Sequence, residues 1–283
     1  MTNIKISGYA DEISSDFETQ LKALKKINMN HIALRTINGV SVFDYAYDQF
    51  KEEIYPLLKS YNISVSEIGS PIGKVHVDDE ISKKKQIDKI DNLIKIMKLL
   101  DTKYLRVFSL YVKEHNDQTF HKVITFLNEV IAKVEGHDLI VLHENEKDIY
   151  GDQAVFCKQI HEHIKHKQFK AIFDFANFVQ VYDDTKQAYS LLQPYIHGFH
   201  IKDADETGRN VLIGEGEGYL SDILSQIDFH RFKGYVTLEP HLVDFDSLKA
   251  LEKKHKGNKS TLSPYQAFLK TLDALYKMLN LDK

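Results

Sequence analysis

The 283-residue chain contains one cysteine, Cys157, five prolines and no tryptophan. A single cysteine cannot form an intrachain disulfide, which excludes a disulfide-stabilised secreted scaffold. No run approaches the roughly 18 apolar residues that a membrane-spanning helix needs. The first residues also lack the apolar core of a signal peptide. We therefore expect a cytoplasmic protein without a membrane partner.

The chain also lacks an excess of positive charge. It has 37 Lys and Arg residues against 41 Asp and Glu residues, a formal net charge of −4. Proteins that bind nucleic acid usually carry a basic surface that displaces counterions from the phosphates. The charge balance therefore predicts no nucleic-acid partner and leaves a small molecule as the expected ligand.

The length fits either one α/β barrel of roughly 250 residues or two smaller domains. Eight short apolar runs alternate with amphipathic stretches of helical period, such as 87–100 and 120–131. No linker rich in Pro, Gly or Ser divides the chain, and the repeat of about 33 residues fits one βα unit. We predict a single-domain (β/α)8 TIM barrel over residues 1–283, with a doubly wound sheet as the rival. The runs expected to form strands are 4–9, 31–35, 63–68, 104–109, 139–144, 170–174, 198–201 and 234–239.

Two long connections, 202–219 and 241–263, follow late strands, on the face where barrels carry their sites. The first contains Gly214-Glu215-Gly216-Glu217-Gly218, which lacks a P-loop lysine and is interpreted as a flexible loop rather than a nucleotide site. The second holds five lysines between 249 and 259, which favour a solvated surface loop over a lid.

The last four expected strands each end in a side chain that can bind a metal ion: Glu144, Asp174, His200 and Glu239. In a parallel barrel the carboxyl ends of the strands meet around one axis, so these four side chains are expected to converge. Three carboxylates at close range would repel one another, and a divalent cation removes that cost. Oxygen donors with one imidazole suit one Mn²⁺, Mg²⁺ or Co²⁺ ion, with Zn²⁺ also possible.

The motifs around these residues resemble the xylose isomerase-like barrels, a group with sugar isomerases, keto-sugar epimerases, inosose dehydratases and apurinic endonucleases. The resemblance covers nearly the whole chain and is carried by four segments and the Gly-Glu-Gly loop. The segments are His143-Glu144-Asn145, Phe173-Asp174-Phe175-Ala176-Asn177, His200-Ile201-Lys202-Asp203 and Leu238-Glu239-Pro240-His241.

The resemblance implies that Glu144, Asp174, His200 and Glu239 share one divalent ion, most often Mn²⁺. It further implies that Glu144 and Glu239 are the catalytic acid/base pair. One glutamate would remove a proton beside the carbonyl of a keto- or aldo-sugar, and the resulting enediolate would be reprotonated from the opposite face. The chain is therefore predicted to be a sugar isomerase or epimerase, and homo-oligomers are common in this group.

Two departures separate the chain from the epimerase branch. Asn177 stands where that branch has a histidine, and Glu206 stands where it has an arginine. The His-x-Lys-Asp pattern at His200 instead resembles the inosose dehydratase branch. Lys202 is interpreted as either a substrate contact or the partner of a neighbouring carboxylate.

Other polar residues near the expected barrel mouth complete the predicted substrate-binding set, which comprises Lys202, Asn177, Glu67, His143 and Lys74. His161, His163 and His166 are expected at a solvated helix end rather than in a metal cluster.

Three other functions remain open. A dehydratase would share the first proton abstraction and then expel a hydroxyl group as water. An abasic-site endonuclease is disfavoured by the charge and by the single ligand set. A sugar-binding barrel without turnover is disfavoured because all four ligands are present.

Overall fold

The computed structural model describes residues 4–245 and 261–281. Eight parallel strands form one sheet in the order β1-β12-β9-β8-β7-β6-β5-β2. The two end strands, β1 and β2, lie in contact, so the sheet curves into a nearly closed barrel. The strands are β1 (Ile6–Gly8), β2 (His31–Leu34), β5 (Ser64–Ile68), β6 (Tyr104–Val107), β7 (Ile140–Glu144), β8 (Phe169–Asp174), β9 (Ile196–Ile201) and β12 (Val236–Leu238).

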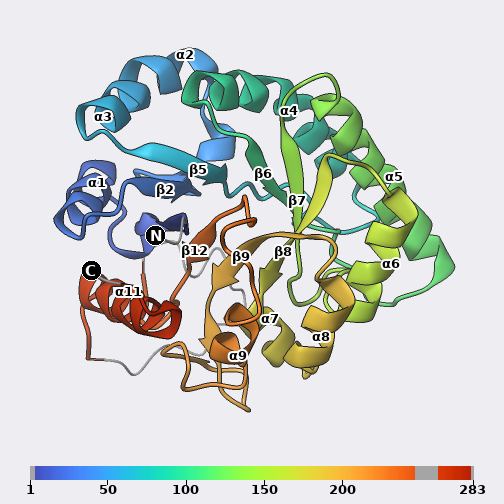
Figure 1. Cartoon of the computed structure of the whole chain (residues 1–283). Helices are drawn as coiled ribbons and strands as arrows, with labels where there is room; N and C mark the ends of the chain where they lie inside the picture. The colour runs from blue at the N-terminus through green and yellow to red at the C-terminus, as the bar shows by residue number, and fades with distance from the viewer. Residues whose placement is uncertain (1–3, 246–260, 282–283) are drawn as a thin grey trace.

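Helices surround the strands (Figure 1). Those with a full apolar face are α1, α4, α5, α6, α8 and α11, and they cover the outer side of the sheet. The helices are α1 (Phe17–Lys26), α2 (Tyr47–Gln49), α3 (Tyr55–Ser60), α4 (Glu80–Leu100), α5 (Asp117–Val134), α6 (Ala154–Ile164), α7 (Phe175–Gln180), α8 (Thr185–Leu192), α9 (Leu220–Leu224) and α11 (Pro264–Leu279). A π-helical turn at Phe50–Ile54 joins α2 to α3. The short 3-10 turns are Ala10–Glu12 and Val42–Asp44, and two small hairpins, β3–β4 (Thr36–Ile37, Val40–Ser41) and β10–β11 (Asp203–Ala204, Asn210–Val211), extend from the barrel.

The sequence explains why these elements form. The strands are short apolar runs, as expected for strands buried on both faces. Helix α5 begins at a capping box, in which the Asn116 side chain accepts a hydrogen bond from the backbone N–H of Thr119 and the Thr119 side chain accepts one from the backbone N–H of Asn116. Its buried face includes Val123, Leu127 and Val130, at helical spacing. The prediction of a (β/α)8 barrel is confirmed for the described residues.

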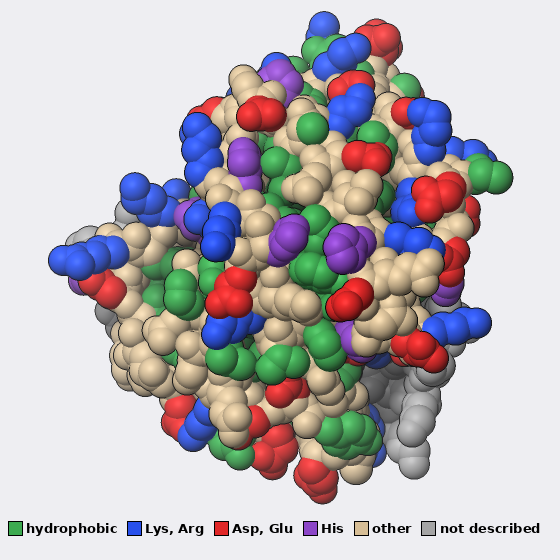
Figure 2. Space-filling model, turned by 90° about the vertical axis from the view of Figure 1, so that its right-hand side faces the viewer, with side chains coloured by type: hydrophobic (Ala, Val, Ile, Leu, Met, Phe, Trp, Pro, Cys, Tyr) green, Lys and Arg blue, Asp and Glu red, His purple; other side chains and the backbone are tan. Residues whose placement is uncertain are grey.

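The outer surface carries charges of both signs. Lysines and arginines are interspersed with acidic residues over the face seen in Figure 2. Several form ion pairs between neighbouring helices, as Lys133 does with Asp91 at 2.5 Å. This face has no broad basic region of the kind that binds a phosphate backbone. Among the described residues, no helix is long and apolar enough to cross a bilayer.

The predicted long loop at 241–263 falls mostly on residues 246–260, which lie outside the described residues together with its lysines. The expectation for the helix-end histidines is wrong for His161. His163 is exposed, but His161 is buried and stacks on Tyr195, with ring centroids 4.9 Å apart.

Candidate functional site

Four metal-binding side chains meet at the carboxyl ends of adjacent strands. Glu144 ends β7, Asp174 ends β8, His200 is the penultimate residue of β9, and Glu239 directly follows β12. One potential ligand atom from each lies within 4.8 Å of the others. All four side chains are buried, with at most 4% of their surface exposed. The convergence predicted from the strand ends is therefore present in the fold.

The imidazole of His200 lies at the centre of this group. Its Nδ1 atom is 2.8 Å from Glu144 Oε1 and 3.1 Å from Glu239 Oε2. Burial by itself would lower the pKa of His200, but the carboxylates of Glu144 and Glu67 raise that pKa well above its ordinary value. The group thus attracts a positive charge at Nδ1, either a proton or a metal ion.

The carboxylates in this group lie close together and still present oxygens that are not fully hydrogen-bonded. Glu144 Oε2, Asp174 Oδ2 and Glu239 Oε2 are buried and make no aligned hydrogen bond. Burial raises the pKa of Asp174 to about 7, with Lys202 opposing the rise. Clustered carboxylate oxygens beside an imidazole form a donor set that suits divalent cations such as Mn²⁺ or Zn²⁺. The residues present therefore fit a bound metal ion.

Three buried cations each hold one of these carboxylates. Arg35 Nη1 lies 2.7 Å from Glu239 Oε1, and Arg106 Nη1 lies 3.2 Å from Glu144 Oε2. Lys202 Nζ lies 3.2 Å from Asp174 Oδ2. The two arginines thus contact the glutamate oxygens that face away from His200. This arrangement fixes the orientation of both glutamates and leaves their other oxygens directed at the imidazole.

A second group of possible ligands comprises Glu12, Glu239 and His241. Arg35 already stands between its carboxylates, 2.7 Å from Glu239 Oε1 and 3.6 Å from Glu12 Oε1. His241 Nε2 contacts the same oxygen of Glu239 at 3.2 Å. Because a guanidinium already supplies positive charge there, the first group is the better fit to a metal ion.

The family model of the xylose isomerase-like TIM barrels matches residues 21–259. The chain belongs to this family. Among curated proteins, none matches the sequence. Solved structures share the family fold at low identity, and at this level the likeness concerns the fold alone.

Three of these structures illustrate the range of the family. The IOLI protein with a bound zinc atom is 14% identical over 98% of both chains, with a TM-score of 0.74. A D-tagatose 3-epimerase-like protein is 15% identical, with a TM-score of 0.74 over 98% of this chain and 97% of that one. The probable 3-DHS dehydratase AsbF from Bacillus anthracis is 15% identical, with a TM-score of 0.68 over 83% of this chain and 92% of that one.

Of the residues predicted to bind substrate, Lys202 and Glu67 contact the group of four possible metal ligands, Lys202 through Asp174 as described above. Lys74 lies apart from that group, 3.0 Å from Glu146 and above the ring of Phe108. Glu67 faces the barrel axis, where its Oε1 atom is 2.9 Å from His200 Nε2. It therefore contacts the imidazole on the side opposite to Nδ1.

Asn177 and His143 are not brought into the ligand group. The side chain of Asn177 donates a hydrogen bond to the carbonyl of Asn145 at 2.8 Å, which ties the ends of β7 and β8 together. His143 lies on the other face of β7 from Glu144, because side chains alternate along a strand. It packs there against His161 and Phe169.

The loop 214–218, expected to be flexible, is held to Asp203 in this barrel. The Asp203 carboxylate accepts hydrogen bonds from the backbone N–H groups of Gly214, Gly216 and Gly218, at 2.8, 3.1 and 2.9 Å. A Cβ atom on Gly216 would lie 2.3 Å from the carbonyl oxygen of Ala204. The glycines thus allow the backbone to approach a buried carboxylate, which occupies the place that an anion would take in a phosphate-binding loop.

Tyr9, Arg35 and Arg106 also contact the site, and they were not among the residues predicted from the sequence. Arg35 had a usable signal, since it follows the apolar run of β2 at the carboxyl end. Arg106 lies inside β6, and a charge within an apolar strand points either into the barrel or toward the helices. Only the register of the sheet decides between these directions.

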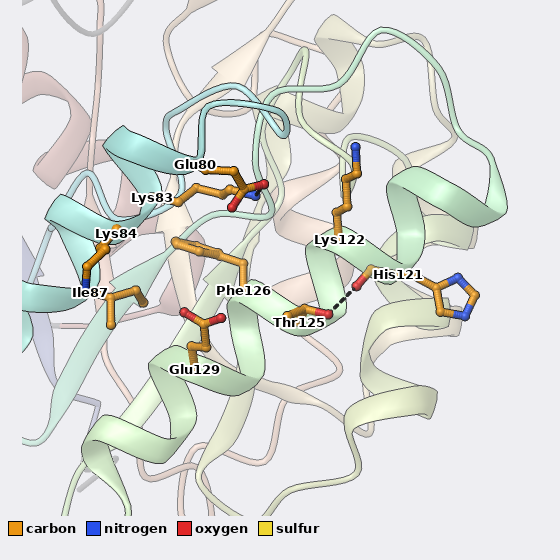
Figure 3. Close-up of a pocket in the computed structure, with 9 residues that line it drawn as sticks. All are labelled: Glu80, Lys83, Lys84, Ile87, His121, Lys122, Thr125, Phe126 and Glu129. Carbon is orange, nitrogen blue, oxygen red and sulfur yellow. Dashed lines mark hydrogen bonds and ion pairs between the residues drawn. The ribbon is translucent and has the colours of Figure 1, made fainter.

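A hollow of about 440 Å³ lies on the outer surface between α4 and α5 (Figure 3). Ile87 and Phe126 form its apolar part. The lysines at its rim pair with acidic neighbours, Lys83 with Glu80 and Lys122 with Asp78. Because these charges are matched within the protein, we assign no ligand to this hollow.

Proposed function

We propose that this barrel is a divalent-metal-dependent isomerase or epimerase that acts on a small keto- or aldo-sugar. The observation that supports this function is the buried cluster of Glu144, Asp174, His200 and Glu239. Its two glutamates lie at the carboxyl ends of β7 and β12, and β8 and β9 stand between these strands in the sheet. This separation favours proton transfer to and from two faces of one bound substrate.

All four side chains are proposed to hold one ion, most often Mn²⁺. Mg²⁺, Co²⁺ and Zn²⁺ suit the same donors, and the IOLI structure holds zinc on a similar fold. When bound, the ion would polarise the substrate carbonyl and acidify the neighbouring C–H bond.

The proton transfers fall to Glu144 and Glu239. One glutamate removes the proton from the carbon beside the carbonyl, and the other returns a proton to the opposite face. Arg35 and Arg106 keep the two carboxylates ionised and in a fixed orientation. The ammonium group of Lys202, buried beside Asp174, is placed to stabilise negative charge that develops on a substrate oxygen.

A dehydratase of a keto-sugar or inosose is the second candidate. It shares the first proton abstraction and then needs an acid that protonates a departing hydroxyl group. The buried ammonium of Lys202 is such an acid, and the fold is shared with the probable dehydratase AsbF. An abasic-site endonuclease is less favoured, because the candidate metal group among the described residues contains one histidine and is not a histidine-rich site for several ions.

The test is a panel of keto-sugars, aldo-sugars and inososes, incubated with Mn²⁺ in D₂O and followed by NMR. Epimerisation or isomerisation predicts deuterium incorporation without loss of water, whereas dehydration predicts an enone product that absorbs in the ultraviolet. The protein should retain about one divalent ion per chain, and Glu144→Gln and Glu239→Gln should each abolish turnover. Glu215→Gln, on an exposed glutamate, is the control. Full activity of the metal-free protein would refute the proposal.

A further inference from the structure

The two nitrogen atoms of His200 face different groups. Nδ1 is directed at Glu144 and Glu239, as described above. Nε2 lies 2.9 Å from Glu67 Oε1, and Glu67 comes from β5, four strands from β9 in the sheet. Both side chains are buried, with 0% and 2% of their surface exposed. The contact therefore crosses the barrel interior and is shielded from water.

Tyr9 holds Glu67 in this position. Its hydroxyl group donates a hydrogen bond to the same oxygen, Oε1, at 2.8 Å. The ring of Tyr9 stands edge-on to the imidazole of His200, with centroids 5.4 Å apart. A Cβ atom on Gly69 would lie 2.6 Å from this ring, so the backbone of the following loop also fits closely around it. Tyr9 and Glu67 thus form a rigid support on the far side of the imidazole.

Both nitrogens of His200 face carboxylates, Nε2 facing Glu67 and Nδ1 facing Glu144. A metal ion held by the surrounding carboxylates would replace the proton at Nδ1 and use its lone pair, while the Nε2–H group still donates to Glu67. The lone pair then points at the carboxylate oxygens that surround the proposed metal position. Such outer carboxylates orient metal-binding histidines and increase their basicity.

We propose that Glu67, supported by Tyr9, is a positioning residue that selects Nδ1 of His200 as the metal-binding atom. This inference rests on the proposed metal site. It reassigns Glu67, which the sequence analysis placed among the substrate contacts. The two roles can be told apart by experiment. Loss of a positioning residue weakens the affinity for the metal ion, whereas loss of a substrate contact raises KM even when the metal site is saturated.

The experiment measures Mn²⁺ affinity on metal-free full-length protein by competition with a chelator. Glu67→Ala should weaken binding by about 10–100-fold. Glu67→Gln should lose less, since its amide oxygen still accepts a hydrogen bond from Nε2–H, and Tyr9→Phe should lose a few-fold. Glu12→Gln is the matched control: Glu12 is also a buried carboxylate near the site, and its contacts are with Arg35 and His241.

Two further readouts separate the possible outcomes. In ¹⁵N NMR of the Zn²⁺-loaded protein, in which the ion is diamagnetic, the wild-type His200 side chain should carry its proton on Nε2, and Glu67→Ala should lose this preference. At saturating Mn²⁺ the Glu67 variants should regain near-normal KM. A wild-type protein that binds no divalent ion would defeat the proposed function itself. If the wild-type protein binds Mn²⁺ but Glu67→Gln and Glu67→Ala bind it as tightly as Glu12→Gln does, only the positioning role is overturned. If Glu67→Ala does not fold, the Mn²⁺ affinities of Glu67→Gln and Tyr9→Phe test the proposal instead.

Discussion

Arg35 and Glu239, separated by 204 positions in the sequence, are joined by an ion pair of 2.7 Å in the barrel interior. The same guanidinium forms two hydrogen bonds with Asp11, from Nε at 2.9 Å and from Nη2 at 3.0 Å. Arg35 follows β2, whereas Asp11 and Glu239 follow β1 and β12. The arginine therefore ties together the carboxyl ends of three neighbouring strands, including β1 and β2, where the barrel closes.

Replacement of Arg35 should destabilise the fold as well as the site. Arg35→Met leaves three buried carboxylates, Asp11, Glu12 and Glu239, without this cation, and removal of one partner of a buried ion pair typically costs about 3–5 kcal/mol. Arg35→Lys keeps the charge but loses the two-pronged contact with Asp11, so its cost should be smaller. Urea denaturation measures both. Arg231→Met removes an ion pair in which the arginine side chain is 90% exposed, and it should leave the midpoint unchanged. Equal midpoints for Arg35→Met and wild type would contradict the role given to Arg35.

The sequence was sufficient to predict the barrel and the convergence of four side chains, because both depend on local patterns. Apolar runs predict buried strands, and a polar residue at the end of each run lies at the carboxyl edge. The alternation of side chains also explains the placement of His143: Glu144 and His143 are consecutive, so only one of them can face the axis. The inward placement of Glu144 therefore already implied that His143 faces the helices.

The roles of Glu67 and Arg106 could not be predicted in the same way. Each makes its decisive contact with a residue far along the chain, Glu67 with His200 and Arg106 with Glu144. Such contacts depend on the curvature and register of the closed sheet. A side chain that faces the axis can support a ligand or contact a substrate, and local sequence does not separate the two.

Loss of the Asp203 carboxylate should release the loop 214–218. Asp203→Asn replaces one accepting oxygen by an NH₂ group, which opposes the loop N–H groups instead of binding them. Hydrogen bonds to a charged group are worth about 1.5–3 kcal/mol each, so the free energy of unfolding should fall by roughly 3 kcal/mol. Native-state hydrogen exchange should show faster exchange at Gly214, Gly216 and Gly218. Glu215→Gln, at an exposed position in the same loop, should change neither quantity, and unchanged exchange in Asp203→Asn would refute the prediction.

Buried histidines behind β7 should make the protein sensitive to acid. Burial lowers the pKa of His143 to about 4, and burial together with His143 lowers the pKa of His161 well below its ordinary value. The unfolded chain takes up protons at these rings below about pH 6.5, whereas the folded protein does so only at lower pH. Stability should therefore fall as the pH drops from about 6.5 toward 4. For His143 alone the loss corresponds to about 3 kcal/mol at pH 4.

His161→Leu isolates this effect from the protonation of carboxylates. Leucine keeps an apolar side chain against Phe169 and Tyr195 but has no group that titrates, so the variant should lose less stability than wild type between pH 6.5 and 4.5. The measurement is the free energy of unfolding in urea at several pH values, and the quantity compared is its slope with pH. His163→Gln changes an exposed histidine on the same helix, and its slope should match that of wild type. If His161→Leu also matched wild type, the buried imidazole would not be a source of acid sensitivity.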